Sequence, residues 1–255
     1  MRLPPGLGER VILCRSLHHP NDKLIELALT AAAARELGAR HLSLVAPYLC
    51  YMRQDKAFQV GEAVSQPIIG ELLARWVDEL VTVDPHLHRV ATLGEAIPVR
   101  RTHCLTAATL MAGFIPRELA DPVLIGPDEE ARQWVAAIAA QACLDYRVGA
   151  KLRHGDRDVA VRFPEPPPAD RHLVLVDDVA STGRTLEAAV AALSPHRPAS
   201  VSVIVTHALF LEGTLERLHQ SGVTRIWSTD SIPHASNRLE LAPLLARALT
   251  EESNA

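Results

Sequence analysis

The sequence has no apolar run of the roughly 18–20 residues needed to cross a bilayer, and its N-terminal segment MRLPPGLGER lacks the apolar core of a secretory signal. It also has no CxxC pair among its cysteines, which are Cys14, Cys50, Cys104 and Cys143. We therefore expect buried, reduced thiols in a cytoplasmic protein, and neither a disulfide framework nor a zinc site. No excess of positive charge is present, because the formal net charge is -4. This argues against a general binder of nucleic acids or membrane surfaces.

The bulk composition is that of an ordinary soluble globular protein. Apolar residues make up 48% of the chain and charged residues 22%. A length of 255 residues is sufficient for two modest domains or one large α/β domain.

The first part of the chain predicts a strand–helix–strand unit. Residues 11–14 are a short apolar run that reads as a strand, and residues 22–37 have helical spacing. A second strand is expected over residues 41–46, where Pro47 ends it. A helix between two strands implies that the strands are parallel.

The same pattern recurs later in the chain. It predicts a strand over residues 173–176, a polar loop over 177–184, a helix over 185–193 and a strand over 201–206. We interpret this as an internal duplication of one α/β unit. Two doubly wound α/β domains are therefore expected, each a largely parallel sheet flanked by helices, with ligands beyond the carboxyl ends of the strands.

Further elements are expected between and after these units. A helix over 67–80 leads into a strand over 81–83, and a strand over 123–125 is followed by a helix over 131–144. Residues 146–152 and 158–163 are expected to form an antiparallel pair, and a final helix is expected over 239–248. Six histidines are expected to be solvated loop residues: His18, His19, His103, His154, His172 and His207.

The loop DDVASTGRT, residues 177–185, combines two kinds of chemistry. A glycine-containing turn at a helix N-terminus offers backbone N–H groups and a positive dipole end to a phosphate, and Ser181, Thr182 and Thr185 add hydroxyl donors. Asp177 and Asp178 repel a phosphate but suit sugar hydroxyls, or magnesium held through water. The combination favours a phosphorylated sugar. The simpler alternative is that Asp178 or Ser181 only caps the helix.

Six segments together resemble one family. Residues 177–185 resemble the phosphoribosyl-binding motif of type I phosphoribosyltransferases. APYLCYMRQDK (46–56), VDPH (83–86) and GPD (126–128) resemble segments of ribose-phosphate pyrophosphokinases, also called PRPP synthetases. THALF (206–210) and TDSIPH (229–234) follow in the order of that family, so the similarity spans residues 21–241.

This resemblance implies two tandem domains with the type I phosphoribosyltransferase fold. Residues 1–118 would form the ATP side, with the C-terminal helix 238–255 as a candidate addition, and residues 119–237 the ribose 5-phosphate side. The family transfers the β,γ-diphosphoryl group of ATP to O1 of ribose 5-phosphate, which gives 5-phosphoribosyl 1-diphosphate (PRPP) and AMP for nucleotide biosynthesis. It requires Mg²⁺ and assembles into homo-oligomers, either dimers or hexamers.

The resemblance also implies roles for individual residues. Lys151 and Arg153 match the mobile catalytic Lys-x-Arg pair of the family. His86 would bind a phosphate oxygen of ATP or help to hold the metal, and Asp128 would act near the ribose or the metal. ATP would be contacted by Arg53, Gln54 and Asp55. Ribose 5-phosphate would be held by Asp177, Asp178, Ser181, Thr182, Gly183, Arg184 and Thr185.

Three departures from the family pattern keep alternatives open. Glu130 stands where the family has glycine in its pyrophosphate loop, and Arg184 replaces a small residue in the ribose-phosphate loop. No Phe-x-Asp-Gly-Glu segment, which in the family reaches a neighbouring subunit's adenine, precedes Val11. The alternatives are a homologue with a different phosphate donor or pentose phosphate, a non-catalytic regulatory homologue, or a phosphoribosyltransferase.

Overall fold

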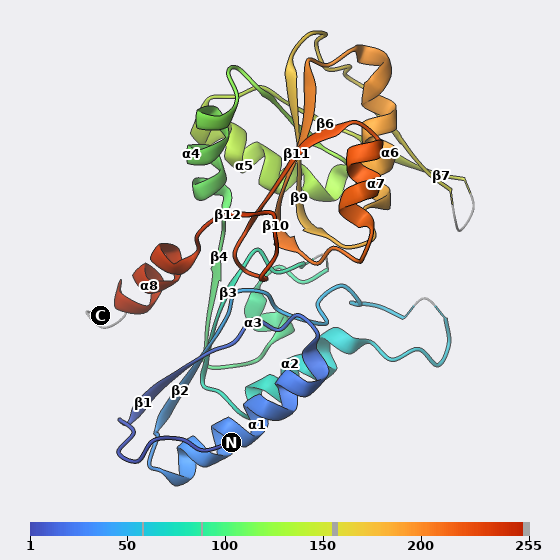
Figure 1. The fold of residues 1–255 in the computed structure, drawn as a ribbon. Coiled ribbons are helices and arrows are strands. Elements are labelled where there is room, and N and C mark those ends of the chain that lie inside the picture. Colours follow the sequence, from blue (N-terminus) through green and yellow to red (C-terminus); the bar gives the residue numbers. More distant parts are fainter. Residues whose placement is uncertain (58, 88, 155–157, 252–255) are drawn as a thin grey trace. The chain divides into compact units, whose positions relative to one another are not determined.

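The computed structural model describes residues 1–57, 59–87, 89–154 and 158–251, except the side chains of 152–154, 158, 159 and 251. Two compact units are formed. The first comprises Met1–Leu105 with the C-terminal segment that starts at Leu241, and the second comprises Thr106–Glu240. Each unit has its own parallel sheet and its own hydrophobic cluster (Figure 1). The expected α/β class is confirmed.

The first unit is built on a four-stranded sheet in which all neighbours are parallel. Its strands lie side by side in chain order: β1 (Arg10–Cys14), β2 (His41–Ala46), β3 (Glu79–Val83) and β4 (Arg101–Leu105). Because the order of these described strands never reverses, the prediction of a doubly wound sheet is wrong for this unit.

Helices cover both faces of this sheet to different extents (Figure 1). One hydrophobic cluster joins β2 to three helices on the same face, namely α1 (Pro20–Glu36), α2 (Ser65–Ala74) and α3 (Leu93–Ala96). The last helix, α8 (Ala242–Glu251), lies against β4 on the other side. The unit therefore has an apolar face under α1–α3 and a second face that is only partly covered by a helix.

The boundary between α2 and β3 differs from the prediction. The expected helix over 67–80 ends at Ala74, and β3 begins at Glu79. Glu79 and Leu80 instead pair with Ser43 and Leu44 of β2 and with Arg101 and Thr102 of β4. Their tertiary pairing in the sheet outweighs the local helical spacing.

The second unit is built on a six-stranded parallel sheet in the order β12-β11-β10-β9-β5-β6. The strands are β5 (Val123–Gly126), β6 (Tyr146–Val148), β9 (His172–Ala180), β10 (Ser200–Ala208), β11 (Val223–Thr229) and β12 (Asn237–Leu239). The chain builds outward from β5 to β6, and then from β9 to β12 in the opposite direction. The sheet is thus doubly wound, as predicted, with its reversal between β5 and β9.

Helices flank both faces of this second sheet (Figure 1). Two helices pack together on one side, namely α4 (Ala108–Glu118) and α5 (Arg132–Ala142). On the other side lie α6 (Arg184–Leu193) and α7 (Thr214–Gln220). Two 3₁₀ turns, Glu129–Ala131 and Ser194–His196, complete the unit.

A separate antiparallel hairpin leaves the second sheet. It consists of β7 (Ala150–His154) and β8 (Asp158–Arg162), which pair with each other. The predicted antiparallel pairing holds for this hairpin but is wrong for residues 146–148, which form β6 and pair in parallel with β5. Gly149 separates the two strands, and a Cβ there would lie 2.6 Å from the carbonyl oxygen of Pro127. The chain therefore changes sheets at a position that is too close to other backbone for a side chain.

Several smaller expectations are corrected by the structure. All four cysteines are unpaired, but only Cys50 is buried, so the prediction of a buried thiol is wrong for Cys14, Cys104 and Cys143. Four of the histidines expected in loops lie in strands: His103 in β4, His154 in β7, His172 in β9 and His207 in β10. No helix in the described ranges is both long and apolar enough to cross a membrane.

Candidate active site

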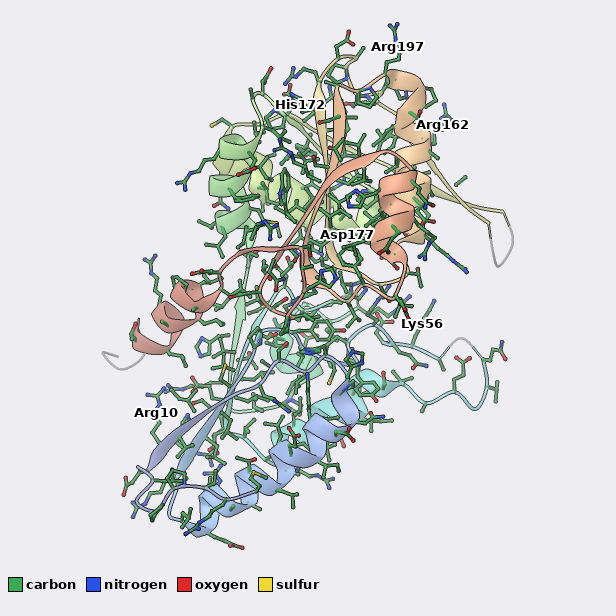
Figure 2. The ribbon with its side chains drawn as sticks, viewed as in Figure 1. Arg10, Lys56, Arg162, His172, Asp177 and Arg197 are labelled. Atoms are coloured by element: carbon green, nitrogen blue, oxygen red, sulfur yellow. The ribbon has the colours of Figure 1, made fainter. Side chains whose placement is uncertain are left out.

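The reversal of strand order places two chemically unusual segments next to each other. Ligands of doubly wound sheets bind beyond the carboxyl ends of the strands where the order reverses. In the second unit this point lies between β5 and β9, which are paired along Val123–Ile125 and Leu173–Leu175. Asp128 follows β5, and Asp177 lies near the carboxyl end of β9, away from His172 at the start of that strand (Figure 2).

The acidic pair lies inside a strand and not in a loop. The prediction placed Asp177 and Asp178 after the strand, but β9 continues to Ala180 because Val179 and Ala180 pair with His207 and Ala208 of β10. Successive side chains of a strand point to opposite faces. At the end of β9 the two carboxylates nevertheless remain close enough to interact, since Asp178 is among the causes that raise the pKa of Asp177.

Hydrogen bonds and burial set the state of these carboxylates. Asp178 is 3% exposed, and its Oδ1 accepts a 2.7 Å hydrogen bond from the backbone N–H of Val179. Asp177 keeps part of its surface exposed, yet burial, followed by the nearby charges of Asp178 and Asp128, raises its pKa well above the ordinary value for aspartate. Asp177, Asp178 and Asp128 thus share one electrostatic environment in which a cation or a hydroxyl donor would be stabilised.

The ribose-phosphate loop follows directly on β9. Gly183 has φ +75° and forms the N-cap of α6, which begins at Arg184. A Cβ on Gly183 would lie 2.7 Å from Cγ2 of Thr214, so both the backbone angle and the available space require glycine here. The N-terminus of the ten-residue helix α6 therefore meets a loop of small residues, the arrangement that binds phosphate through backbone N–H groups.

A residue that was not predicted from the sequence anchors this loop from outside it. The guanidinium of Arg217, on α7, donates to the carbonyl oxygen of Thr182 at 2.8 Å and to Oε1 of Glu187 at 3.0 Å. Thr214 Oγ1 donates to the carbonyl oxygen of Ser181 at 3.3 Å. The loop is consequently tied to α7 by its carbonyl groups, which leaves its N–H groups available for a ligand.

The two residues that depart from the family pattern are both exposed. Arg184 is the first residue of α6, and its side chain makes no hydrogen bond or ion pair with the part of the chain that the structure describes. The side chain of Glu130 is exposed on the 3₁₀ turn after β5. Neither side chain is buried in the loop that contains it.

The turn after β5 is held together by Asp128. Asp128 is 7% exposed, and its Oδ1 accepts hydrogen bonds from the backbone N–H groups of Glu130 and Ala131 at 3.1 and 3.3 Å. Its other oxygen, Oδ2, lies 3.6 Å from Nζ of Lys151 on β7. The structure thus brings together two predicted site residues from different elements.

Arg153, the second member of the predicted catalytic pair, lies on β7 opposite Val159 of β8. Its side chain is outside the described part of the structure. It lies two residues from Lys151 on the same strand.

The predicted ATP-binding residues lie in the first unit, on loops after β2 and β3. Gln54 accepts a backbone hydrogen bond of 3.2 Å from Gln66, and Arg53 is exposed. Asp55 Oδ1 lies 3.4 Å from Nε of Arg89 on the loop that also carries His86. Arg89 was not singled out from the sequence, and its ion pair connects the two loops at the carboxyl end of this sheet.

Metal binding was predicted at His86 and Asp128, which lie in different units. Among the described residues, no group of three or more His, Cys, Asp or Glu side chains is arranged to hold a metal ion. The carboxylates of Asp128, Asp177 and Asp178 are hard oxygen donors, the type that magnesium prefers when it also binds substrate phosphates. A magnesium ion at this place would therefore need oxygen atoms of a phosphorylated ligand in addition to these carboxylates.

Comparison with known proteins gives consistent matches. The family model described as phosphoribosyl transferase domain matches residues 106–241, and that described as N-terminal domain of ribose phosphate pyrophosphokinase matches residues 7–76. Ribose-phosphate pyrophosphokinase of Methanopyrus kandleri is 33% identical over 253 residues, covering 98% of this chain and 85% of the relative. The protein of that name from Halobacterium salinarum is 32% identical, covering 97% and 86%.

A solved structure agrees in fold. The crystal structure of phosphoribosylpyrophosphate synthetase from Mycobacterium smegmatis matches with a TM-score of 0.79 at 23% identity, and the match covers 95% of this chain and 82% of that one. Because the domain models and the curated relatives agree along almost the whole chain, the protein belongs to the ribose-phosphate pyrophosphokinase family.

Proposed function

We propose that this protein is a ribose-phosphate diphosphokinase, which transfers the β,γ-diphosphoryl group of ATP to O1 of ribose 5-phosphate and forms PRPP and AMP. The observation that carries the proposal is the junction at the carboxyl end of β9. There the acidic pair Asp177–Asp178 is followed within one short segment by the phosphate-binding loop at the N-terminus of α6. The relatives carry the name of this activity along nearly the full length of the chain.

Ribose 5-phosphate is proposed to bind along β9 and the loop after it. Backbone N–H groups of the loop and the hydroxyl groups of Ser181, Thr182 and Thr185 would hold the 5-phosphate. Asp177 and Asp178 would accept hydrogen bonds from ribose hydroxyls, or bind magnesium, at the other end of the sugar. In this orientation O1 is directed away from the phosphate loop.

The proposed reaction is an in-line attack of O1 on the β-phosphorus of ATP. A bond forms between O1 and the β-phosphorus, and the bond from that phosphorus to the oxygen bridging the α-phosphorus breaks, so that AMP leaves. Negative charge spreads over the transferred group in such a transition state. Lys151 and Arg153 are proposed to neutralise this charge from the β7–β8 hairpin, and bound Mg²⁺ would supply further neutralisation.

The ATP side is proposed to use Arg53, Gln54, Asp55 and His86 of the first unit. The ion pair between Asp55 and Arg89 supports this proposal, because it holds together the two loops that carry these residues. Mg²⁺ dependence with His86 and Asp128 near the metal, a homo-oligomeric state as dimer or hexamer, and a cytoplasmic location remain predictions.

The proposal is tested by incubating the pure protein with ATP, Mg²⁺ and ribose 5-phosphate and quantifying AMP, ADP and PRPP. We expect AMP and PRPP in equal amounts. An Asp178→Asn variant should form both products more slowly than the native protein. ADP in place of AMP would identify a simple kinase. Turnover only with another donor or another pentose phosphate would identify the divergent homologue, and no turnover with any donor would favour a regulatory protein.

A further inference from the structure

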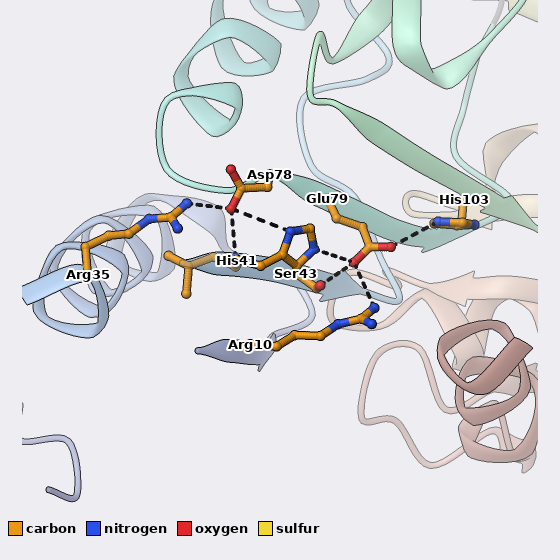
Figure 3. Close-up of polar contacts among 8 residues, drawn as sticks. Arg10, Arg35, His41, Ser43, Asp78, Glu79 and His103 are labelled. Atoms are coloured by element: carbon orange, nitrogen blue, oxygen red, sulfur yellow. Dashed lines mark hydrogen bonds and ion pairs between the residues drawn. The ribbon is translucent and has the colours of Figure 1, made fainter. Parts of the chain in front are cut away.

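Each unit contains a polar cluster that joins segments far apart in the sequence. In the first unit, the fully buried carboxylate of Glu79 lies on the face of the sheet that α1–α3 do not cover. It contacts side chains of β1, β2 and β4, namely Arg10, His41, Ser43 and His103 (Figure 3). Every one of these residues lies on a strand, so this cluster joins the strands of the sheet to one another.

The cluster of the second unit reaches the ribose-phosphate loop instead. At its centre is the guanidinium of Arg217, whose Nη2 donates to the carbonyl oxygen of Thr182 at 2.8 Å and to Oγ1 of Thr214 at 3.1 Å. The hydroxyl of Thr214 donates in turn to the carbonyl oxygen of Ser181 at 3.3 Å. Arg217 therefore holds one carbonyl group of the loop directly and a second one through Thr214.

Two backbone hydrogen bonds fix the same carbonyl groups and the next one. The N–H of Leu211 donates to the carbonyl oxygen of Ser181 at 3.2 Å, and the N–H of Glu187 donates to that of Gly183 at 2.8 Å. In a planar trans peptide the carbonyl group and the following N–H group point in opposite directions. The N–H groups of residues 182–184 are therefore directed away from these partners, as phosphate binding at a helix N-terminus requires.

The other side of the guanidinium is held by α6. Nε of Arg217 donates to Oε1 of Glu187 at 3.0 Å, and Glu187 lies in the first turn of that helix. The two side chains are 46% and 30% exposed, and an ion pair between groups this exposed contributes little to folding stability. Its main consequence is geometric, because one planar group joins α7, the first turn of α6 and the carbonyl group of Thr182.

Packing limits the direction in which the loop can relax. A Cβ on Gly183 would lie 2.7 Å from Cγ2 of Thr214 and 3.7 Å from Cγ of Leu218, and both of these residues of α7 are fully buried. The loop therefore cannot move closer to α7. Once released by Arg217, it can move only away from that helix, on the side to which its N–H groups point.

We propose that Arg217 is a positioning residue for ribose 5-phosphate, which orders the N–H groups of the loop for the 5-phosphate without contacting the sugar phosphate itself. This inference rests on the proposed function, because it assigns a further role at the same site. A loop that is already ordered loses little conformational freedom on binding, so removal of its anchor weakens binding. The 5-phosphate is remote from O1, where the new bond forms. We therefore expect a higher KM for ribose 5-phosphate, with kcat and the KM for ATP near their native values.

The test is calorimetric titration of full-length variants with ribose 5-phosphate, combined with initial rates and thermal unfolding. Arg217→Met removes the guanidinium and retains an unbranched side chain. Its dissociation constant for ribose 5-phosphate should rise at least about tenfold, because charge-assisted hydrogen bonds to the loop are lost. Arg217→Lys keeps the charge but not the planar fork, and it should give an intermediate value.

The matched control is Arg225→Met. The side chain of Arg225 is 49% exposed, and its Nη1 contacts the carbonyl oxygen and a carboxylate oxygen of Glu118 at 3.2 and 3.4 Å. It thus makes the same kinds of contact as Arg217, but with the end of α4. Its loss should leave the dissociation constant unchanged. Equal constants for Arg217→Met and Arg225→Met would overturn the positioning role alone, whereas a native protein that does not bind ribose 5-phosphate would overturn the proposed function and this role with it.

A further variant, Glu187→Gln, separates positioning from direct attraction between Arg217 and the phosphate. It removes the negative charge that neutralises Arg217, while the amide oxygen of glutamine can still accept from Nε. We expect a dissociation constant equal to or above the native one. Tighter binding of ribose 5-phosphate in Glu187→Gln would show that Arg217 acts on the phosphate through its charge, and this would overturn the proposal.

Discussion

Nζ of Lys151 lies 3.6 Å from Oδ2 of Asp128, which joins the β7–β8 hairpin to the turn after β5. Asp128 is 7% exposed, and its other oxygen holds two backbone N–H groups of the turn. The carboxylate is therefore fixed by the turn, whereas the side chain of Lys151 is partly exposed. We propose that Lys151 exchanges this contact for the transferred phosphoryl group once substrates are bound.

Replacing Lys151 by alanine is predicted to lower kcat by roughly 10²–10³-fold, the loss typical for one group that stabilises transition-state charge. The melting temperature should change little, because an ion pair with a partly exposed lysine contributes at most about 1 kcal/mol. Initial rates and thermal unfolding measure both effects. Arg162→Ala on the paired strand β8 removes a neighbouring exposed cation and should retain native turnover. Native turnover in Lys151→Ala would remove this lysine from the mechanism.

Replacing Asp177 by asparagine is predicted to stabilise the protein at neutral pH while weakening its binding of ribose 5-phosphate. The folded-state pKa of Asp177 is raised by burial and by Asp178 and Asp128, so ionisation is easier in the unfolded chain. The native protein therefore loses stability as the pH rises from about 4, the unfolded pKa, through the raised folded value. The asparagine side chain of the variant cannot ionise and should avoid this loss.

The measurement for Asp177→Asn is urea unfolding of both proteins between pH 4 and pH 8. The stability gained by the variant should be smallest at pH 4 and should grow with pH. A gain that is constant across this range would show that the pKa of Asp177 is not responsible. Calorimetric binding of ribose 5-phosphate, measured in parallel, tests whether the destabilising carboxylate is kept for ligand binding.

Replacing Gly183 by alanine is predicted to cost about 2–4 kcal/mol of folding stability and to weaken binding of ribose 5-phosphate. The left-handed φ of +75° accounts for about 1–2 kcal/mol, and the new Cβ would press on Cγ2 of Thr214. Gly222→Ala is the control, because Gly222 has φ +109° with open space around it. It should show the backbone cost alone and normal ligand affinity. Equal losses in the two variants would show that the contact with Thr214 has no effect.

How far the site can be predicted from sequence depends on the distance along the chain between its parts. The acids, the small residues, Gly183 and the start of α6 are consecutive, so their order alone predicted a sugar-phosphate loop. Arg217 is 35 residues from Thr182, and nothing in its own segment indicates that it donates to that carbonyl. The end of β9 was misplaced for a similar reason, because its last residues are strand only through their pairing with β10.

The polar face of the first sheet shows the same limit more strongly. Glu79 was expected at the end of a helix, where a glutamate would be exposed. Its contacts come from Ser43, 36 residues earlier, and His103, 24 residues later. These groups meet only after β2, β3 and β4 have taken their register, and a one-residue slip would turn Glu79 to the apolar face under α1–α3.

Replacing Arg184 by glutamine is predicted to raise the dissociation constant of ribose 5-phosphate by about tenfold or more, because a guanidinium at the start of α6 can form charge-assisted bonds to the 5-phosphate. The control is Arg197→Gln, an exposed arginine beyond the other end of α6 and far from Asp177 (Figure 2). Calorimetric titration of both variants provides the comparison. An unchanged or lower dissociation constant for Arg184→Gln would show that this arginine does not contact the phosphate.

The central claim is that the β- and γ-phosphates of ATP move together to O1 of ribose 5-phosphate. Phosphorus NMR of a reaction with ATP, Mg²⁺ and ribose 5-phosphate follows this directly. The account predicts that the three ATP signals are replaced by the single signal of AMP and by two coupled signals of a diphosphate attached to C1 of the sugar. Signals of ADP and a sugar monophosphate ester at C1, or of free inorganic phosphate formed without a sugar diphosphate, would contradict it.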